Sequence, residues 1–134
     1  QIVASLKGSR ISEVGGKPHD FSLKDCLFVA PYNLQVGKLI KELGSDAKVG
    51  SVDLFQGQEA PIVFLSMCSS DGESSPRGLT FLLNKNRLNV AISRAKALAI
   101  VVGSSRLADT RATSIKAMRL LNLYCRILET SSEN

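Results

Sequence analysis

Residues 84–103, NKNRLNVAISRAKALAIVVG, decide the fold. Four apolar residues recur at the spacing of a single helix face: Leu88, Ala91, Ile92 and Ala95. This periodicity predicts an amphipathic helix over 84–96. Residues 98–102 are all apolar and end at Gly103, which is typical of a buried strand. A helix followed directly by a buried strand is the repeating unit of an α/β domain.

The same alternation extends through the rest of the chain. Apolar runs predict further strands at 27–30, 49–55 and 62–67, and helical spacing predicts helices at 33–43 and 111–129. Leu34, Leu39, Ile40 and Leu43 form the expected apolar face of the first of these helices. Turns are expected at 15–18, an exposed loop at 69–78 and a frayed tail at 130–134. The pattern predicts an α/β fold with a mainly parallel sheet.

The composition is that of one globular domain. The chain has 134 residues, of which 44% are hydrophobic and 22% charged. No apolar run approaches the roughly 20 residues that a bilayer-spanning helix needs. A membrane span and a disordered chain are both excluded, and we expect a single domain over residues 1–134.

Positive charge is concentrated in one quarter of the sequence. The net charge is +5, and eight of the 17 basic residues fall in 84–119, where Asp109 is the only acid. A solvated helical surface explains such a segment, and so does a polyanionic partner. Charge alone does not separate the two.

The three cysteines and the single histidine give no metal set. Cys26, Cys68 and Cys125 stand far apart beside apolar runs, and His19 has no second histidine. We expect buried, reduced thiols and therefore a reducing, cytoplasmic compartment.

The first residue is Gln1 without a targeting signal, so we expect a piece of a larger protein.

Three blocks carry a family resemblance. SVDLFQGQE at 51–59 and NRLNVAISRAK at 86–96 resemble motifs V and VI of Upf-like superfamily 1 helicases, and PYNLQ at 31–35 resembles their motif IV region. Ser51 stands where threonine is frequent, and Lys96 where a second arginine is frequent. Both departures keep the chemistry of the position. QGQEAP at 56–61 and PRGL at 76–79 look closest to bacterial fusions of a RecB-like nuclease with such a helicase.

The resemblance implies the second, C-terminal RecA-like motor domain, a three-layer P-loop NTPase-type fold without its own Walker A loop. No Gly-x-x-x-x-Gly-Lys-Ser/Thr segment occurs. ATP with Mg²⁺ is then expected between this domain and an N-terminal RecA-like domain of the same protein, which would carry the phosphate loop and metal-binding acids. The chain alone is expected to be inactive. The implied partners are single-stranded nucleic acid, with DNA favoured over RNA, and a RecB-like nuclease acting in DNA repair.

Two arginines are the candidates for phosphate chemistry. Arg94 matches the motif VI arginine finger, because a guanidinium beside a transferring phosphoryl group raises the rate by roughly 10³–10⁵. Arg87 lies seven residues earlier, about 20° away on an ideal helix. It either contacts phosphate or shapes the surroundings of Arg94. A surface ion pair is the alternative for Arg94.

The connection at 56–59 is the second candidate nucleotide contact. Gly57 lacks a Cβ and lets backbone N–H groups approach an anion. By resemblance Gly57 lies near the γ-phosphate, Glu59 contacts the nucleotide at its ribose and Gln56 orders the loop. Taken alone, the glycine is an ordinary turn residue and Glu59 a solvated carboxylate.

By resemblance, nucleic acid contacts the domain near Tyr32, Ser51 and Val52. A hydroxyl and backbone N–H groups suit phosphate without reading sequence. Tyr32 either stacks on a base or is a half-buried tyrosine at a strand end.

Two other functions compete with the motor: a basic domain that binds nucleic acid passively, and a self-contained hydrolase. The lone histidine and the lack of a Gly-x-Ser-x-Gly elbow argue against the hydrolase.

Overall fold

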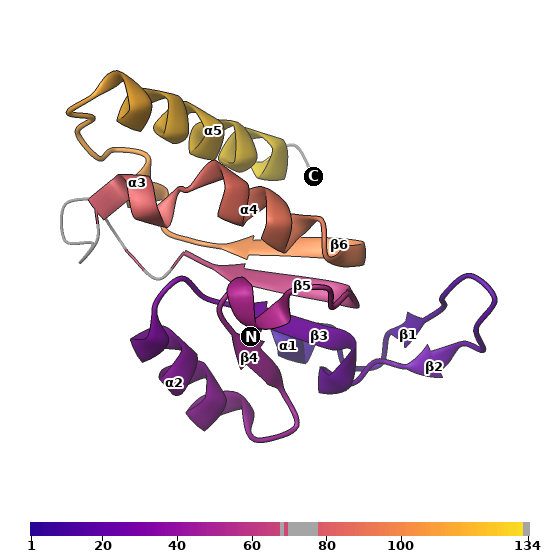
Figure 1. Cartoon of the computed structure of the whole chain (residues 1–134). Helices are drawn as coiled ribbons and strands as arrows, with labels where there is room; N and C mark the ends of the chain where they lie inside the picture. The colour runs from indigo at the N-terminus through magenta and orange to yellow at the C-terminus, as the bar shows by residue number, and fades with distance from the viewer. Residues whose placement is uncertain (68, 70–77, 133–134) are drawn as a thin grey trace.

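A four-stranded parallel sheet forms the centre of the molecule in the computed structural model, which describes residues 1–67, 69 and 78–132 (Figure 1). Its strand order is β4-β3-β5-β6. The strands are β3 (Cys26–Val29), β4 (Lys48–Gly50), β5 (Ala60–Ser66) and β6 (Ala95–Val102). All three pairings are parallel. The predicted α/β class and parallel sheet are confirmed.

Helix α2 (Asn33–Leu43) covers one face of the sheet. It begins after Pro31, whose ring ends the preceding strand, and stops at Gly44, where φ is +85°. The predicted apolar face is only half right. Leu39 and Leu43 pack against the sheet, but Leu34 and Ile40 are exposed.

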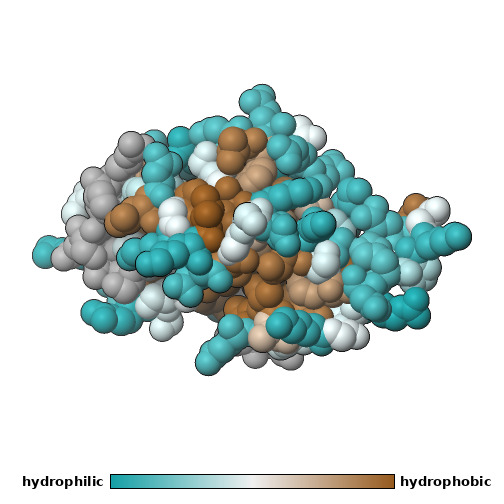
Figure 2. Space-filling view, turned by 90° about the horizontal axis from the view of Figure 1, so that it is seen from below, coloured by the Kyte–Doolittle hydropathy of each residue, from teal (hydrophilic) through white to brown (hydrophobic). Residues whose placement is uncertain are grey.

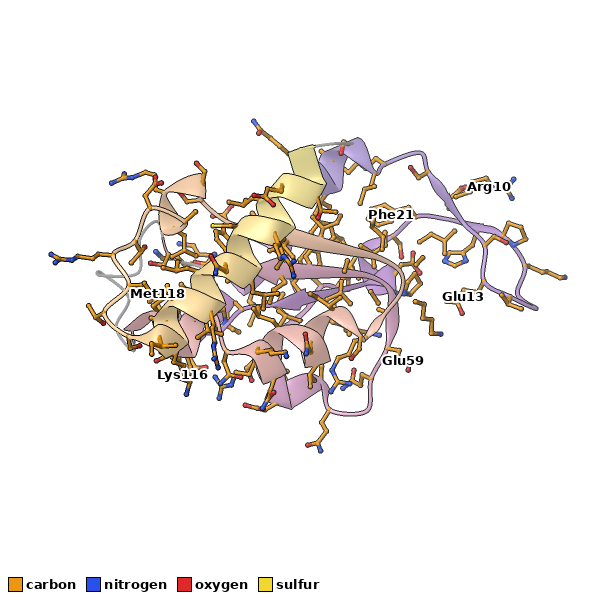
Figure 3. All side chains as sticks on the ribbon, turned by 90° about the horizontal axis from the view of Figure 1, so that it is seen from above. Arg10, Glu13, Phe21, Glu59, Lys116 and Met118 are labelled. Carbon is orange, nitrogen blue, oxygen red and sulfur yellow. The ribbon has the colours of Figure 1, made fainter. Side chains whose placement is uncertain are left out.

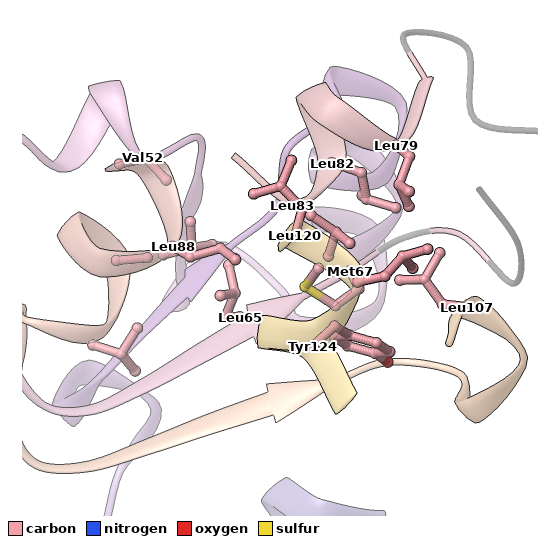
Figure 4. Packing of buried hydrophobic residues seen from close by; sticks show 14 of the residues in the cluster. Val52, Leu65, Met67, Leu79, Leu82, Leu83, Leu88, Leu107, Leu120 and Tyr124 are labelled. Atoms are coloured by element: carbon pink, nitrogen blue, oxygen red, sulfur yellow. The ribbon is translucent and has the colours of Figure 1, made fainter. Parts of the chain in front are cut away.

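Three helices cover the opposite face and give the third layer. They are α3 (Gly78–Leu82), α4 (Lys85–Ile92) and α5 (Ile115–Ser132). Leu65 and Met67 from the β5 segment meet Leu82 of α3 and Leu120 of α5 in the larger core cluster (Figure 4). Burying each such side chain contributes roughly 1.5–3 kcal/mol. Tyr124 closes this core, and its hydroxyl donates to the Ser104 carbonyl oxygen at 3.0 Å.

The N-terminal quarter adds a small protruding hairpin. Helix α1 (Ile2–Ser5) leads into β1 (Arg10–Ile11) and β2 (His19–Asp20), which pair antiparallel around the predicted turn at 15–18 (Figure 1). Glu13 in the hairpin loop forms an ion pair with Lys96 near the start of β6, at 3.2 Å. The pair ties the hairpin to the sheet.

Several predicted boundaries were wrong. The helix predicted over 84–96 ends at Ile92, so Ala95 begins β6 instead of extending the helix face. The strand predicted over 49–55 ends at Gly50, because residues 53–55 form the short 3-10 helix η2 (Asp53–Phe55).

The ends of other elements also differ from prediction. Strand β6 lies at the sheet edge, and Leu98 is exposed where a buried strand was predicted. Helix α5 begins at Ile115, later than predicted, and continues to Ser132 through part of the predicted frayed tail. The predicted loop falls largely on 70–77, outside the described residues.

The α2 side of the sheet carries an apolar hollow of about 380 Å³. Phe28 and Phe64 stack at its base with ring centroids 4.8 Å apart. Figure 2 shows apolar side chains gathered in the middle of this face within a hydrophilic border. Within the described part of the chain, none of the helices has the length and hydropathy that crossing a membrane requires.

Cys26 is buried and free, and Cys125 is partly buried and free. Burial raises the pKa of the Cys26 thiol to about 11, which keeps it protonated and inert. The prediction of buried thiols is right for Cys26 and only partly right for Cys125, and Cys68 lies outside the described residues.

Candidate functional site

The carboxyl ends of β3, β4 and β5 meet at one edge of the sheet. Strand β4, which follows β3 in the chain, lies on one side of β3, and β5 lies on its other side. The order of the strands therefore reverses between β3 and β5. Doubly wound sheets bind ligands at such a switch point. Here Pro31 and Ser51 follow β3 and β4, Ser66 ends β5, and all three line a small hollow of about 30 Å³, which we call the edge hollow.

Ser51 and Val52 form a turn at this edge. The Gly50 carbonyl oxygen accepts from the Ala30 N–H at 3.0 Å, which holds the end of β4 against β3. The Ser51 carbonyl oxygen accepts from the Leu54 N–H at 3.2 Å and starts η2. Both Ser51 and Val52 line the edge hollow.

Tyr32 lies beside this hollow and packs against Phe81, a residue that the sequence analysis did not single out. It is the N-cap residue of α2 and is partly buried. Its ring centroid lies 5.4 Å from that of Phe81 in α3, with the planes tilted by 33°. Phe81 itself lines the hollow. No motif marks Phe81, and the helix that carries it was predicted as loop at its first residue.

A second, larger hollow of about 340 Å³ lies between η2 and α4. We call it the basic hollow because its lining includes two arginines. It is lined by Val52, Asp53, Gln56, Asn86, Arg87, Val90 and Arg94. Val52, Asp53 and Arg87 line both hollows. The two hollows are therefore neighbours that share a wall.

Arg87 is held on three sides. Its guanidinium carbon lies 4.5 Å from the Phe81 ring centroid, and its Nη2 lies 3.8 Å from Asp53 Oδ2. Its backbone N–H donates to Asn84 Oδ1 at 3.1 Å, which caps α4. With Asp53 79% exposed, the ion pair itself adds little stability, so packing on the ring is the main restraint.

Arg94 lies in the turn between α4 and β6, beyond the end of the helix. The predicted helical relation to Arg87 is therefore wrong, although both side chains reach the basic hollow. Its Nη1 donates to the Gln58 carbonyl oxygen at 3.1 Å. Its Nε is buried and has no hydrogen-bond partner among the residues that the structure describes. A buried donor left unpaired costs about 1–3 kcal/mol of stability.

The connection at 56–59 is a tight turn, as predicted. Gly57 has φ +77°, a conformation that favours glycine, and Gln58 N–H donates to the Phe55 carbonyl oxygen at 2.9 Å. Gln56 lines the basic hollow, but Gly57 and Glu59 do not. Glu59 is exposed on the connection, on the side of the molecule that carries Glu13 (Figure 3).

A family model described as "AAA domain" matches residues 1–106. The chain belongs to this family. This AAA domain contains both hollows within the matched residues, and only α5 and the segment leading to it lie beyond them.

The relatives of this AAA domain are named helicases. It is 42% identical over 85 residues to the DNA polymerase alpha-associated DNA helicase A of Schizosaccharomyces pombe, covering 61% of this chain and 12% of that protein. It is 42% identical over 90 residues to the mouse RNA helicase Mov10l1, covering 62% of this chain and 8% of that protein. It is 39% identical over 106 residues to the probable RNA helicase armi of Drosophila melanogaster, covering 72% and 8%.

The chain thus spans about a tenth of the length of these relatives. With the motifs and the parallel sheet, they make this AAA domain a helicase domain of the superfamily 1 type with a RecA-like fold. Among residues 1–67, 69 and 78–132 there is no cluster of three or more side chains that could hold a metal ion.

Proposed function

We propose that this chain is the second, C-terminal RecA-like motor domain of an ATP-dependent nucleic-acid helicase. One observation carries the proposal: Gln56, Arg87 and Arg94 line a single open hollow although they come from three segments. By resemblance all three belong to the nucleotide site, with Arg94 as the finger, Gln56 ordering the loop and Arg87 either contacting phosphate or shaping the surroundings of Arg94. A surface with two guanidinium groups at one opening suits the phosphates of a nucleotide.

The side chains fit an anionic group at the basic hollow. Arg94 has a buried Nε without a partner in the described part of the chain and spends Nη1 on the Gln58 carbonyl oxygen. Arg94 forms no ion pair within the described part of the chain, so its guanidinium can donate to phosphate oxygens in the basic hollow without breaking one. Arg87 adds a second positive charge whose position Phe81 restrains.

ATP would supply the phosphoryl group whose transfer drives the motor. In this proposal Arg94 is the catalytic finger, and Arg87 and Gln56 lie beside the phosphates of ATP. Gly57 and Glu59 contact the nucleotide from the exposed connection when a second lobe closes on it. The N-terminal RecA-like domain of the same protein would hold Mg²⁺ and the phosphate loop. The isolated chain would then hydrolyse no ATP.

Single-stranded nucleic acid is the proposed track, along the edge hollow. Ser51 offers a hydroxyl, the Ser51–Val52 turn offers backbone N–H groups, and Tyr32 and Phe81 offer ring faces. Of the three relatives reported, two are named RNA helicases, which weighs against the predicted preference for DNA. We therefore propose a strand contacted through its backbone, with DNA and RNA tested in parallel.

A cytoplasmic location remains part of the proposal and rests on the two free cysteines. The RecB-like nuclease fusion and a role in DNA repair remain predictions from the sequence. The relatives reported are named only as helicases.

The decisive experiment uses the complete protein that contains this domain. Arg94→Ala should lower strand-stimulated ATP hydrolysis by roughly 10³-fold or more while nucleotide binding changes little. Arg94→Lys keeps the charge, loses the planar fork and should recover only a small part of the rate. Lys41→Gln, on the far side of the sheet, is the matched surface control. An unchanged rate in Arg94→Ala would remove this residue from the finger role.

The passive binding module is the second candidate, and the exposed cations of the 84–119 segment favour it. Such a module binds a strand with salt-sensitive affinity regardless of nucleotide. Strand affinity in the complete protein should be compared with and without a non-hydrolysable ATP analogue. A change in affinity supports the motor, and equal affinity supports the passive module.

A further inference from the structure

Four basic side chains surround the beginning of α5. Arg106 lies in the 3-10 helix η3 (Ser105–Leu107), Arg111 in the following loop, and Lys116 and Arg119 in the first turns of α5. All four are exposed, and none of them forms an ion pair within the described part of the chain. We call them the α5 basic face.

The composition of this segment leaves its positive charge uncompensated. Asp109 is the only acid between residues 105 and 119. Lys116 and Arg119 are three residues apart, which brings their Cβ atoms to about 5–6 Å on a helix. Ala117 and Leu120 between and beside them are buried, so the two cations cannot fold inward. Both charges therefore lie at the surface of the helix.

The fold places this face next to the edge hollow. Strand β6 runs parallel to β5, so η3 begins at the same sheet edge as Ser66. Helix α3 packs against α5, and its Phe81 reaches the edge hollow and the Tyr32 ring. Figure 1 shows the start of α5, α3 and the start of α2 at one end of the molecule. A single helix therefore separates the α5 basic face from the proposed strand path.

We propose that the α5 basic face is a second strand-binding surface, which contacts the phosphates of a single strand after it passes the edge hollow. The inference rests on the proposed function, because the edge hollow defines where the strand runs. Flexible ammonium and guanidinium donors bind phosphate without reading bases, so the surface would add affinity and no sequence preference. It lies beyond residue 106, where the family match ends.

The test measures binding of the 134-residue chain to oligothymidylate and oligouridylate by fluorescence anisotropy over a salt series. Lys116→Gln/Arg119→Gln should weaken binding by roughly tenfold at low salt. It should also reduce the slope of log affinity against log salt by about 1.4, since each phosphate contact on a single strand contributes about 0.7. Circular dichroism melting checks that the variant is folded.

Lys41→Gln/Lys48→Gln is the matched control. It removes the same charge from exposed positions at the last turn of α2 and the start of β4, at the opposite edge of the sheet. Its affinity should fall by less than about twofold. An equal loss in both variants would mean that only net charge matters, and would overturn the proposal.

A third variant separates this inference from the proposed strand path. Tyr32→Ala weakens binding if the strand crosses the edge hollow. If Tyr32→Ala weakens binding and the α5 double variant does not, the α5 basic face is excluded while the path stands. If the reverse holds, the path fails and the α5 basic face stands as a polyanion site of its own.

Discussion

The guanidinium carbon of Arg87 lies 4.5 Å from the centre of the Phe81 ring, so the one cation among the described residues that lines both hollows rests on an aromatic face. A cation above a ring is attracted by about 0.5–1 kcal/mol at an exposed site. Phe81 in turn packs against Tyr32. The contact therefore joins the aromatic side of the edge hollow to the charged side of the basic hollow.

A double-mutant cycle between Phe81→Leu and Arg87→Gln should give a coupling energy of about 0.5–1 kcal/mol in urea unfolding. Leucine keeps apolar bulk but removes the ring, so the cycle isolates the ring–cation contact. The control cycle pairs Phe81→Leu with Lys85→Gln, an exposed residue of the same helix. A coupling no larger than in that control would show that Arg87 does not depend on the ring.

Asn84→Ala should lower the free energy of unfolding by about 0.5–2 kcal/mol, because the Asn84 side chain caps α4 through the Arg87 N–H. Thermal or urea unfolding measures the change. Asn89→Ala, at an exposed position inside the same helix, is the control and should have little effect or stabilise slightly. Equal effects at both positions would contradict the cap.

Gly103→Ala should destabilise the domain by about 1–3 kcal/mol. A Cβ at Gly103 would meet the Tyr124 hydroxyl and lie 3.1 Å from Met67 Cγ. The cost should shrink in a Tyr124→Phe background, where the hydroxyl is gone, and urea unfolding of the four proteins measures this. Gly37→Ala, inside helix α2, is a control of opposite sign, since nothing lies within 4 Å of its added Cβ.

His19 should titrate above its ordinary pKa of 6.5, because its side chain is hydrogen-bonded to Asp25 at 2.8 Å. Burial favours a higher pKa for Asp25, but hydrogen bonds from His19 and Ser22 outweigh it and leave the pKa below 3.8. The single histidine gives one imidazole signal by NMR. Asp25→Asn should return its pKa toward 6.5, and Asp20→Asn should not.

The sign of the pH effect follows from these directions. The His19 contribution to stability is complete below pH 6.5 and is lost as the pH rises through the raised pKa. The Asp25 contribution is complete above pH 3.8 and is lost as the pH falls through the lowered pKa. The pair therefore supports the hairpin most between these values. Amide exchange in the hairpin should therefore be followed over pH in the unmodified chain and in Asp25→Asn. The same pH dependence in both would contradict this.

The sheet and its helices could be predicted because apolar runs and helical spacing depend on local sequence. The segment around Arg94 could not. Ala95 and Lys96 suit a helix as well as a strand, and the choice is made by a distant partner, since the Ala60 N–H donates to the Arg94 carbonyl oxygen. That pairing ends α4 early and starts β6.

The site was partly predictable for the same reason. The motifs pointed to Ser51, Gln56 and Arg94, which line the two hollows, and their roles stay predictions. Phe81 and Asp53 were missed, because their roles come from the tertiary packing of α3 and η2 around Arg87. Side chains without a motif become visible as site residues only in three dimensions.

The wall shared by the two hollows has a mechanical consequence. Val52 and Arg87 are each held by their own elements, one at the end of a sheet strand and the other on a capped helix, and both border the two openings. In the proposed motor, the nucleotide contacts and the strand contacts would therefore lie on the same lobe and meet at this shared wall. The length of its step along the strand would then be set by how far the whole lobe moves, because both sets of contacts move with it.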